Sequence, residues 1–324
     1  MERLDAFMAR AAGAYYARGE GIGRDFTTAP EMSQAFGECL GLWAAVTWQA
    51  MGAPGRVVLA ELGPGRGTLM ADALRAVDEM MPAFGQAAEV HLVETSPMLK
   101  AEQARRLGGR VAAWHADVAT LPNGPAIVLA NEFFDALPIR QFVKRPGGWR
   151  ERFVAKASFV EQDCDHAEEA PEGAIREICE PGQSIVEALA SRLAVQGGAL
   201  LALDYGPAES GFGDTLQALL GNDRADPLAA PGEVDVTAHV DFAALASAGR
   251  AAGAAAHGPL PMGLFLQRLG LMARSAMLAR MKPASAGMVL SAAQRLVAPE
   301  GMGRLFKALV LAHPSLPTPA GFES

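Results

Sequence analysis

The chain has 324 residues, of which half are hydrophobic and 20% are charged, and its formal net charge is -8. This composition is typical of a globular protein with one large domain or two, and it excludes a disordered chain. Because the chain is acidic and contains no run of lysines and arginines, it is a poor candidate for binding nucleic acid through the phosphates.

Cysteine and hydropathy patterns limit the compartment and the cofactors. Cys39, Cys164 and Cys179 are far apart and form no Cys-x-x-Cys pair, which argues against a disulfide framework or a cysteine-rich zinc site. The six histidines show no metal-ligand spacing, so we expect no metal. No apolar run is long enough to span a bilayer, and the N-terminus lacks the features of a secretory signal. We therefore expect a cytoplasmic protein without membrane insertion.

The N-terminal segment reads as helical, and strands follow it. Leu4, Phe7 and Met8 recur at helical spacing and predict an amphipathic helix within a helical segment over residues 1–50. Short apolar runs then predict strands at 56–61, 89–94, 110–114, 126–130 and 198–204. Such uniformly apolar strands are typical of a parallel sheet that is covered on both faces.

Helical patterns lie between these strands, after Gly67, at 96–107 and at 182–195. The second pattern has Ser96 as its expected N-cap and Pro97 as its first helical residue. The alternation of strands and helices predicts an open, Rossmann-like α/β fold, with helices on both faces of a mostly parallel sheet.

Two segments interrupt the alternation. Residues 140–160 contain two strand-like pieces around Pro146-Gly147-Gly148, which predicts a hairpin. Residues 206–238 are rich in Gly, Asp and Pro and are expected to form loops or to cap the sheet. Near the end, 304–313 is compatible with a helix or a strand. We therefore expect a main domain over 51–324 with insertions at about 140–160 and 206–238.

A glycine-rich turn follows the first predicted strand. The stretch ELGPGRGTL (61–69) contains Gly63, Gly65 and Gly67, with Glu61 ahead of them. Glycine permits positive φ and lets a ligand approach the backbone closely. Dinucleotide turns usually read G-x-G-x-x-G and bring a pyrophosphate to a helix N-terminus, whereas this turn reads G-x-G-x-G. A carboxylate at Glu61 is unsuited to an anion but suits an ammonium group, which favours S-adenosylmethionine over NAD.

Acids also end the next two predicted strands. Glu94 is placed to accept hydrogen bonds from both ribose hydroxyls, a feature shared with NAD sites. Asp117 is placed to accept from an adenine amino group while the backbone N–H of Val118 meets the ring, which NAD sites do not routinely need. Each acid alone is equally compatible with a loop carboxylate or a helix cap. Three acids at successive strand ends favour the donor site.

The stretch LANEFFDALPIRQF (129–142) follows the fourth predicted strand, where the transferable methyl group is expected. Asn131, Glu132 and Asp135 are the candidate catalytic residues. Because Glu132 and Asp135 are three apart, one helical turn would bring them to one side, where they could grip a planar guanidinium. Phe133-Phe134 could wall a dry pocket. The alternative is that both rings are core and that Asp135 caps a short helix.

Six blocks of the chain resemble those of the MidA-type methyltransferases, and together they extend over nearly the whole sequence. The blocks are DFTTAPEMSQAFGE (25–38), ELGPGRGTL (61–69), ANEFFDALPIRQF (130–142), LDYG (203–206), DVTAHVDF (235–242) and GMGRLFKALVLA (301–312). The resemblance implies a class I methyltransferase fold with a seven-stranded sheet that includes a final strand, and S-adenosylmethionine as the cofactor. For the mitochondrial members it implies methylation of an arginine on a core subunit of respiratory complex I.

The turn glycines, the strand-end acids and the block beside the methyl group match positions of this family. The resemblance further implies that Asp25, Thr27 and Thr28 cover the donor from the N-terminal side. The chain departs from the family at Arg24, where members usually have a small residue, and at Ala29, where they usually have serine. These departures affect substrate entry more than donor binding.

The leading hypothesis is a protein-arginine methyltransferase linked to complex I assembly, with a protein substrate. One alternative keeps the chemistry but changes the acceptor to a small molecule or another side chain. Another is an assembly factor that binds the donor without turnover. An NAD-dependent oxidoreductase is disfavoured by the spacing of the turn glycines. The sequence leaves the oligomeric state open, a homodimer included.

Overall fold

A central seven-stranded sheet organises the molecule, which is seen here in a computed structural model that describes residues 1–18, 28–221 and 223–323. Its strands are β2 (Val57–Leu62), β3 (Ala88–Val93), β4 (Val111–His115), β5 (Ala126–Asn131), β10 (Gly198–Tyr205), β14 (Ala255–Pro261) and β15 (Phe306–Ala312). They lie in the order β14-β15-β10-β5-β2-β3-β4. Only β15 runs antiparallel to its neighbours within this sheet, so the predicted mostly parallel seven-stranded fold is confirmed.

The five predicted strands each end within one residue of their observed bounds. Residues 304–313, which the sequence left open between helix and strand, contain the strand β15. The predicted cap is also confirmed, because the Ser96 hydroxyl accepts from the Leu99 amide at 3.4 Å and Pro97 opens the helix α6 (Pro97–Leu107).

Two hydrophobic cores cover the two faces of the sheet. Alternate residues of a strand point to opposite faces, so Val57 and Leu59 enter one core while Val58 and Ala60 enter the other. Helices of the first core are α3 (Gln34–Ala50), α4 (Thr68–Met80), α5 (Pro82–Ala87), α9 (Met262–Arg268), α10 (Leu271–Met281) and α11 (Ala286–Val297). Helices of the second core are α7 (Glu180–Gln196) and α8 (Phe242–Ala251). Both faces are thereby buried, as the uniformly apolar strands require.

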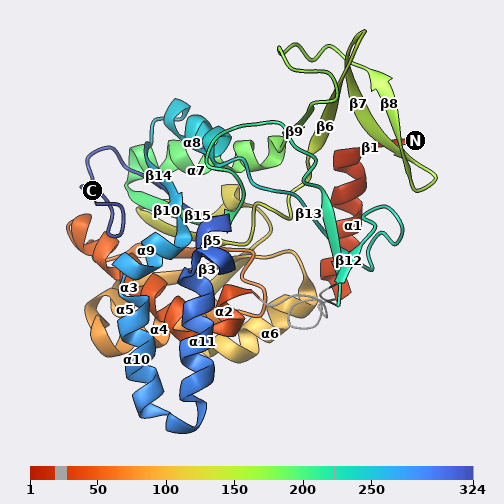
Figure 1. Cartoon of the computed structure of the whole chain (residues 1–324). Helices are drawn as coiled ribbons and strands as arrows, with labels where there is room; N and C mark the ends of the chain where they lie inside the picture. The colour runs from red at the N-terminus through yellow and green to blue at the C-terminus, as the bar shows by residue number, and fades with distance from the viewer. Residues whose placement is uncertain (19–27, 222, 324) are drawn as a thin grey trace.

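A five-stranded sheet lies to one side of the central sheet (Figure 1). It is formed by β1 (Glu2–Arg3), β6 (Arg140–Arg145), β7 (Gly148–Ala155), β8 (Ser158–Asp163) and β9 (Ile175–Ile178). Arg145 pairs with Gly148 across a two-residue turn, so β6 and β7 form the hairpin that the sequence predicts.

A three-stranded sheet occupies the segment that was expected to form loops or a cap. It consists of β11 (Gln217–Leu220), β12 (Asp223–Ala225) and β13 (Asp235–Thr237). The helix α1 (Leu4–Arg18) packs against both small sheets through a third apolar cluster, in which Leu4 and Phe7 meet Val154 of β7 and Val236 of β13. This helix therefore joins the two insertions.

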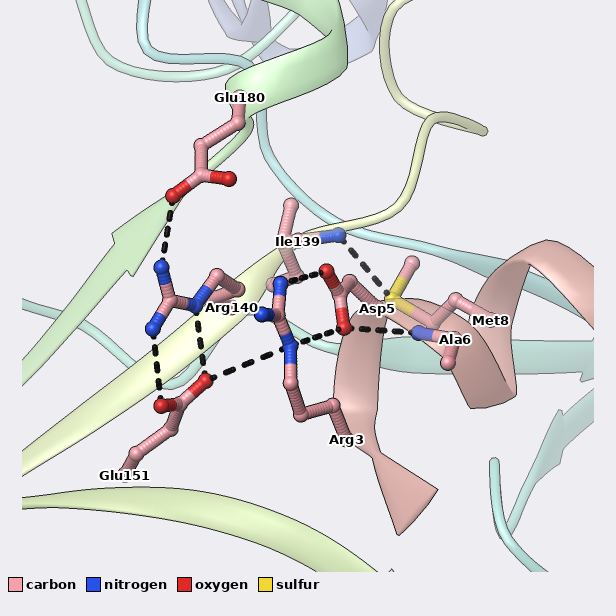
Figure 2. Close-up of polar contacts among 8 residues, drawn as sticks. All are labelled: Arg3, Asp5, Ala6, Met8, Ile139, Arg140, Glu151 and Glu180. Carbon is pink, nitrogen blue, oxygen red and sulfur yellow. Dashed lines mark hydrogen bonds and ion pairs between the residues drawn. The ribbon is translucent and has the colours of Figure 1, made fainter.

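Ion pairs fix the beginning of α1 against β6 and β7 (Figure 2). The Arg140 guanidinium donates to both oxygens of Glu151, at 2.7 and 2.8 Å, and to Glu180 at 2.7 Å. Arg3 donates to Asp5 at 3.0 Å and lies 3.9 Å from Glu151. The first turn of α1 is thereby held beside the hairpin.

Candidate functional site

A cavity of about 1160 Å³ opens at the carboxyl ends of the parallel strands, where ligands bind in doubly wound folds. The ends of β2, β3 and β5 contribute Glu61, Glu94 and Asn131 to its lining. The helix α1 and the strand β13 form a further wall, with Tyr16 and Asp235 facing the cavity.

The glycine turn between β2 and α4 lines this cavity. Gly63, Gly65 and Gly67 all have positive φ, at 58°, 52° and 76°. Gly63 and Gly65 line the cavity, whereas Gly67 is the N-cap of α4. A Cβ atom at Gly63 would approach the Phe133 ring to 3.0 Å, so the turn fits only with a residue that has almost no side chain.

Glu61 has the electrostatics expected of a group that binds a cation. Glu61 is 3% exposed, and among the described residues its Oε2 has no hydrogen-bond partner. Burial raises the pKa of Glu61 to about 8. An ammonium group in the cavity would supply both the missing donor and the compensating charge, so this end of the cavity fits the amino-acid part of S-adenosylmethionine.

The carboxylates of Glu94 and Asp117 differ in their surroundings. Glu94 is buried, its Oε1 accepts from the amides of Thr95 and Ser96 at 2.8 Å, and its Oε2 lies 3.3 Å from Gln103. Burial raises the pKa of Glu94. Asp117 is exposed and caps a short helical turn by accepting from Ala119 N at 2.8 Å.

Asp117 thus has the capping role that the sequence left open, and it still lines the cavity. Val118 is buried beneath it and also lines the cavity. Thr28 lines the cavity from the start of the short helix α2 (Ala29–Met32), while Asp25 and Thr27 lie outside the described residues.

The segment after β5 does not form the helical turn that was expected to bring Glu132 and Asp135 together. Glu132 has a φ of 49°, and its amide donates to Leu203 O at 2.8 Å. The amides of Phe133, Phe134 and Asp135 instead converge on Oδ2 of Asp204, at 3.1, 2.9 and 3.2 Å.

Asp204 is fully buried at the end of β10 and holds this segment in place. No role was predicted for Asp204, although it lies in the LDYG block. Its contact with the segment after β5 depends on β10 being the neighbour of β5, which the local sequence does not reveal.

Glu132 and Asp135 both line the cavity, although the backbone between them does not form the predicted helical turn. Glu132 Oε1 accepts from Ala29 N at 3.0 Å and from Asn131 Nδ2 at 3.1 Å. Enclosure by the cavity, followed by the charges of Asp135 and Asp235, raises the pKa of Glu132 to about 7. Burial raises the pKa of Asp135 to about 6, against a hydrogen bond from Tyr205 that lowers it. This end of the cavity therefore also favours a cationic ligand.

The two aromatic rings of the segment separate. Phe133 lines the cavity, whereas Phe134 is buried in the core under α7, and the rings meet edge to face at 5.2 Å between centroids. Asn131 Oδ1 is buried and has no hydrogen-bond partner among the residues that the structure describes.

Within residues 1–18, 28–221 and 223–323, no group of three or more His, Cys, Asp or Glu side chains is placed to hold a metal ion. In the same ranges, every helix is too short or too polar to cross a membrane.

Comparison with known proteins identifies relatives over most of the chain. A family model for S-adenosyl-L-methionine-dependent methyltransferases matches residues 39–260. The protein arginine methyltransferase NDUFAF7, mitochondrial, of Mus musculus is 34% identical over 96% of this chain and 80% of its own length. The Homo sapiens protein of the same name is 32% identical over 96% of this chain and 79% of its own length.

Solved structures give the same result. A COG1565 superfamily member from Burkholderia thailandensis, bound to S-adenosyl-homocysteine, is 26% identical with a TM-score of 0.79, over 99% of this chain and 88% of that chain. A native structure of a protein of this superfamily from the same organism is 29% identical, with a TM-score of 0.81. The match covers 99% of this chain and 89% of that chain.

The names of the relatives correct one expectation. The curated relatives are named as mitochondrial proteins, so the cytoplasmic location expected from the sequence is wrong. The physical reason is that cysteine spacing and hydropathy do not separate one reducing compartment from another.

Proposed function

Because the chain belongs to the family of S-adenosyl-L-methionine-dependent methyltransferases, we propose that it methylates an arginine side chain of a protein substrate. One observation supports this acceptor above others. Glu132 and Asp135 line the same cavity as the donor turn, and neither forms an ion pair with a described lysine or arginine. Two enclosed carboxylates that lack an ion pair with a described lysine or arginine are suited to a ligand that carries a positive charge.

The donor, when bound, supplies a methyl group on a sulfonium and leaves as S-adenosylhomocysteine. In our proposal Glu61 binds the ammonium of the donor, Glu94 the ribose, and Asp117 with Val118 the adenine. The glycines of the turn, with Thr28, Asp25 and Thr27, surround the same ligand. These assignments are consistent with the positions of the described residues along the cavity.

The acceptor guanidinium is then oriented by Glu132 with the support of Asp135 and Asn131. A guanidinium is protonated and a poor nucleophile, so a carboxylate that fixes it and takes up the proton lost by one nitrogen promotes transfer. Phe133 keeps water from the reacting atoms, which strengthens these charge-assisted contacts. Placement in a dry site is the main contribution that such a transfer needs.

We further propose a core subunit of respiratory complex I as the protein substrate. This step is supported by the resemblance of the sequence blocks to the mitochondrial members of the family. We also propose that residues 1–50 cover the donor site of a domain over 51–324, because Gly13 and Tyr16 of α1 line the cavity. A homodimer is compatible with this arrangement and is not required by it.

Mass spectrometry of protein-arginine methylation in cells with and without the gene tests the proposal. We expect at least one arginine methylation to disappear on deletion, to return with the wild-type gene, and to stay absent with Glu132→Gln. An unchanged set of methylated arginines would contradict the proposal, and return of the modification with the variant would remove Glu132 from it.

A further inference from the structure

The cavity is larger than one small ligand requires. Its volume of about 1160 Å³ exceeds the roughly 300–1,000 Å³ typical of such a pocket. Beyond the ends of the parallel strands, its wall continues over the sheet formed by β11, β12 and β13 and over the segment that joins α11 to β15. These elements can therefore contact parts of a substrate protein other than the side chain that is methylated.

The three-stranded sheet turns one face to the cavity. Residues that lie directly opposite each other in an antiparallel pair point to the same face of a sheet. Leu219 of β11 is paired with Arg224 of β12, and both residues line the cavity. Ala218 points the other way and belongs to the apolar cluster that includes Leu4 and Phe7 of α1. Because α1 covers that opposite face, the sheet presents Leu219 and Arg224 to the cavity.

Arg295 provides a cation on a different wall. It lies in the last turn of α11 and lines the cavity, as do Met302 and Leu305 farther along the chain. The chain folds back on this turn, since a Cβ atom at Gly301 would clash with the Arg295 carbonyl oxygen. Leu305 is exposed. Both walls thus combine an arginine with apolar side chains.

Neither Arg224 nor Arg295 is neutralised by an acid. Both are exposed, and among the residues that the structure describes neither side chain forms an ion pair or a hydrogen bond. Arg66, which also lines the cavity, instead donates to Glu102 at 2.8 Å. Arg224 and Arg295 are therefore available to an acidic group of a ligand.

The cavity has charges of opposite sign in different parts. Glu132 and Asp135 are enclosed, whereas Arg224 and Arg295 are exposed to solvent. When a substrate arginine enters to meet the two carboxylates, its neighbours in the substrate sequence lie toward the exposed part of the cavity. Acidic neighbours complement the two cations there, and basic neighbours are repelled by them.

We infer that Arg224 and Arg295 are specificity-determining residues that bind acidic side chains next to the target arginine of the substrate. The inference rests on the proposed function and names the class of substrate, an arginine in an acidic segment. A guanidinium binds a carboxylate through paired N–H donors in a planar fork. Leu219 and Leu305 add apolar contacts to the same segment. The two arginines thus affect which substrate is bound and leave donor binding unchanged.

Equilibrium binding of short peptides tests this assignment without turnover. Each peptide is acetylated and amidated and contains one arginine, with serines, glutamates or lysines on both sides of it. The peptides are titrated into protein saturated with S-adenosylhomocysteine. We expect the wild type to bind the glutamate peptide about fivefold to tenfold more tightly than the serine peptide, and the lysine peptide most weakly. Added salt should reduce this difference.

Paired variants locate the source of the preference. Arg224→Gln with Arg295→Gln should bind the glutamate and serine peptides within about twofold of each other, with unchanged affinity for S-adenosylhomocysteine. Arg224→Lys with Arg295→Lys keeps both charges and should retain most of the preference. Arg250→Gln removes another exposed cation from α8, outside the cavity lining, and should bind all peptides as the wild type does.

Equal binding of the glutamate and serine peptides by the wild type overturns the inference, and so does a preference that survives in the double glutamine variant. A loss of S-adenosylhomocysteine affinity in that variant also overturns it, because the arginines would then bind the carboxylate of the donor. Should the double variant not fold, as judged by circular dichroism, an undiminished preference in both single variants overturns the inference. The proposed function itself fails only if the wild type binds each arginine peptide no more tightly than a matched citrulline peptide.

Discussion

Glu132 combines a left-handed backbone with a carboxyl group whose pKa is about 7. A non-glycine residue at a φ of 49° is strained by about 1–3 kcal/mol and persists only where the surroundings fix it. Here Asp204 fixes it by accepting the next three amides. Strain of this kind often accompanies function, and at this position it directs the carboxylate into the cavity.

Substitution of Glu132 tests its part in transfer. Glu132→Gln preserves the shape but removes the charge, so it should slow methyl transfer by roughly 10 to 100-fold while affinity for S-adenosylhomocysteine stays nearly unchanged. The wild-type rate should also fall as the pH drops through about 7, because protonation removes the carboxylate that the reaction needs. The variant should lack that limb of the pH profile. A loss of donor affinity would place Glu132 in the donor site instead.

Glu61 makes the free protein less stable, and its substitution should reveal this. Its pKa is raised from 4.5 to about 8, so between these values the folded protein holds a proton that the unfolded chain releases. The free energy of unfolding therefore falls as the pH rises through this window.

Glu61→Gln should remove that decline and raise the free energy of unfolding by roughly 1–3 kcal/mol near pH 8, while S-adenosylhomocysteine binding falls by at least about tenfold. Denaturant unfolding and calorimetry measure the two effects. Glu187→Gln, at an exposed position of α7, is the matched control. If Glu61→Gln and the wild type had the same free energy of unfolding, the buried carboxyl group would not destabilise the folded protein.

At the scale of elements, the turn between β2 and α4 depends on glycines that all have positive φ. Gly65 lines the cavity at a φ of 52°. Gly65→Val should abolish donor binding, since a β-branched residue resists positive φ and its side chain takes the space of the ligand. Gly52→Val is the control, because Gly52 has a φ of 85° in open surroundings.

Both variants should lose similar stability, but only Gly65→Val should lose affinity in calorimetry with S-adenosylhomocysteine. Normal binding by a folded Gly65→Val would restrict the turn to a structural role.

The anchoring of α1 makes a separate prediction (Figure 2). Arg140→Ala leaves Glu151, which is 6% exposed, with Arg3 at 3.9 Å as its nearest cation in this cluster. We expect a loss of about 1–3 kcal/mol in the free energy of unfolding. Arg150→Ala breaks an exposed pair with Asp163 and should change it by less than about 0.5 kcal/mol. Unfolding in guanidinium chloride measures both variants. If Arg140→Ala and Arg150→Ala lost similar free energies of unfolding, the Arg140 cluster would stabilise the protein no more than an exposed ion pair does.

Sequence patterns were informative for some elements and silent for others. Uniformly apolar runs located five strands of the central sheet, because burial on both faces leaves little choice of residue. The edge strand β14 was not predicted, since it is only partly buried and its sequence is not uniformly apolar. The strands β11 to β13 have only three or four residues each, too few for a period to emerge. The turn at Glu132 was predicted as helical, because the spacing of two acids does not reveal the buried Asp204 that overrides it.

At the scale of the whole molecule, the predictable part of the site is the part that the sheet assembles. Parallel strands end at one edge, so Glu61, Glu94 and Asn131 were expected together, and all three line the cavity. The contact between Tyr16 of α1 and Asp235 of β13 was not predicted, because the two residues are 219 positions apart in the sequence. No local pattern reports such a contact, and only the packing of α1 against the insertions creates it.

The central claim is that one cavity brings a methyl donor and an arginine side chain together, and heavy-methyl transfer tests it most directly. The purified protein is incubated with S-adenosylmethionine that has a deuterated methyl group and an extract of cells lacking the gene. Mass spectrometry then locates the label. The account predicts deuterated methyl groups on arginine with the wild type and almost none with Glu132→Gln. Label confined to other side chains or to small molecules, or no label in a protein that binds the donor, would contradict it.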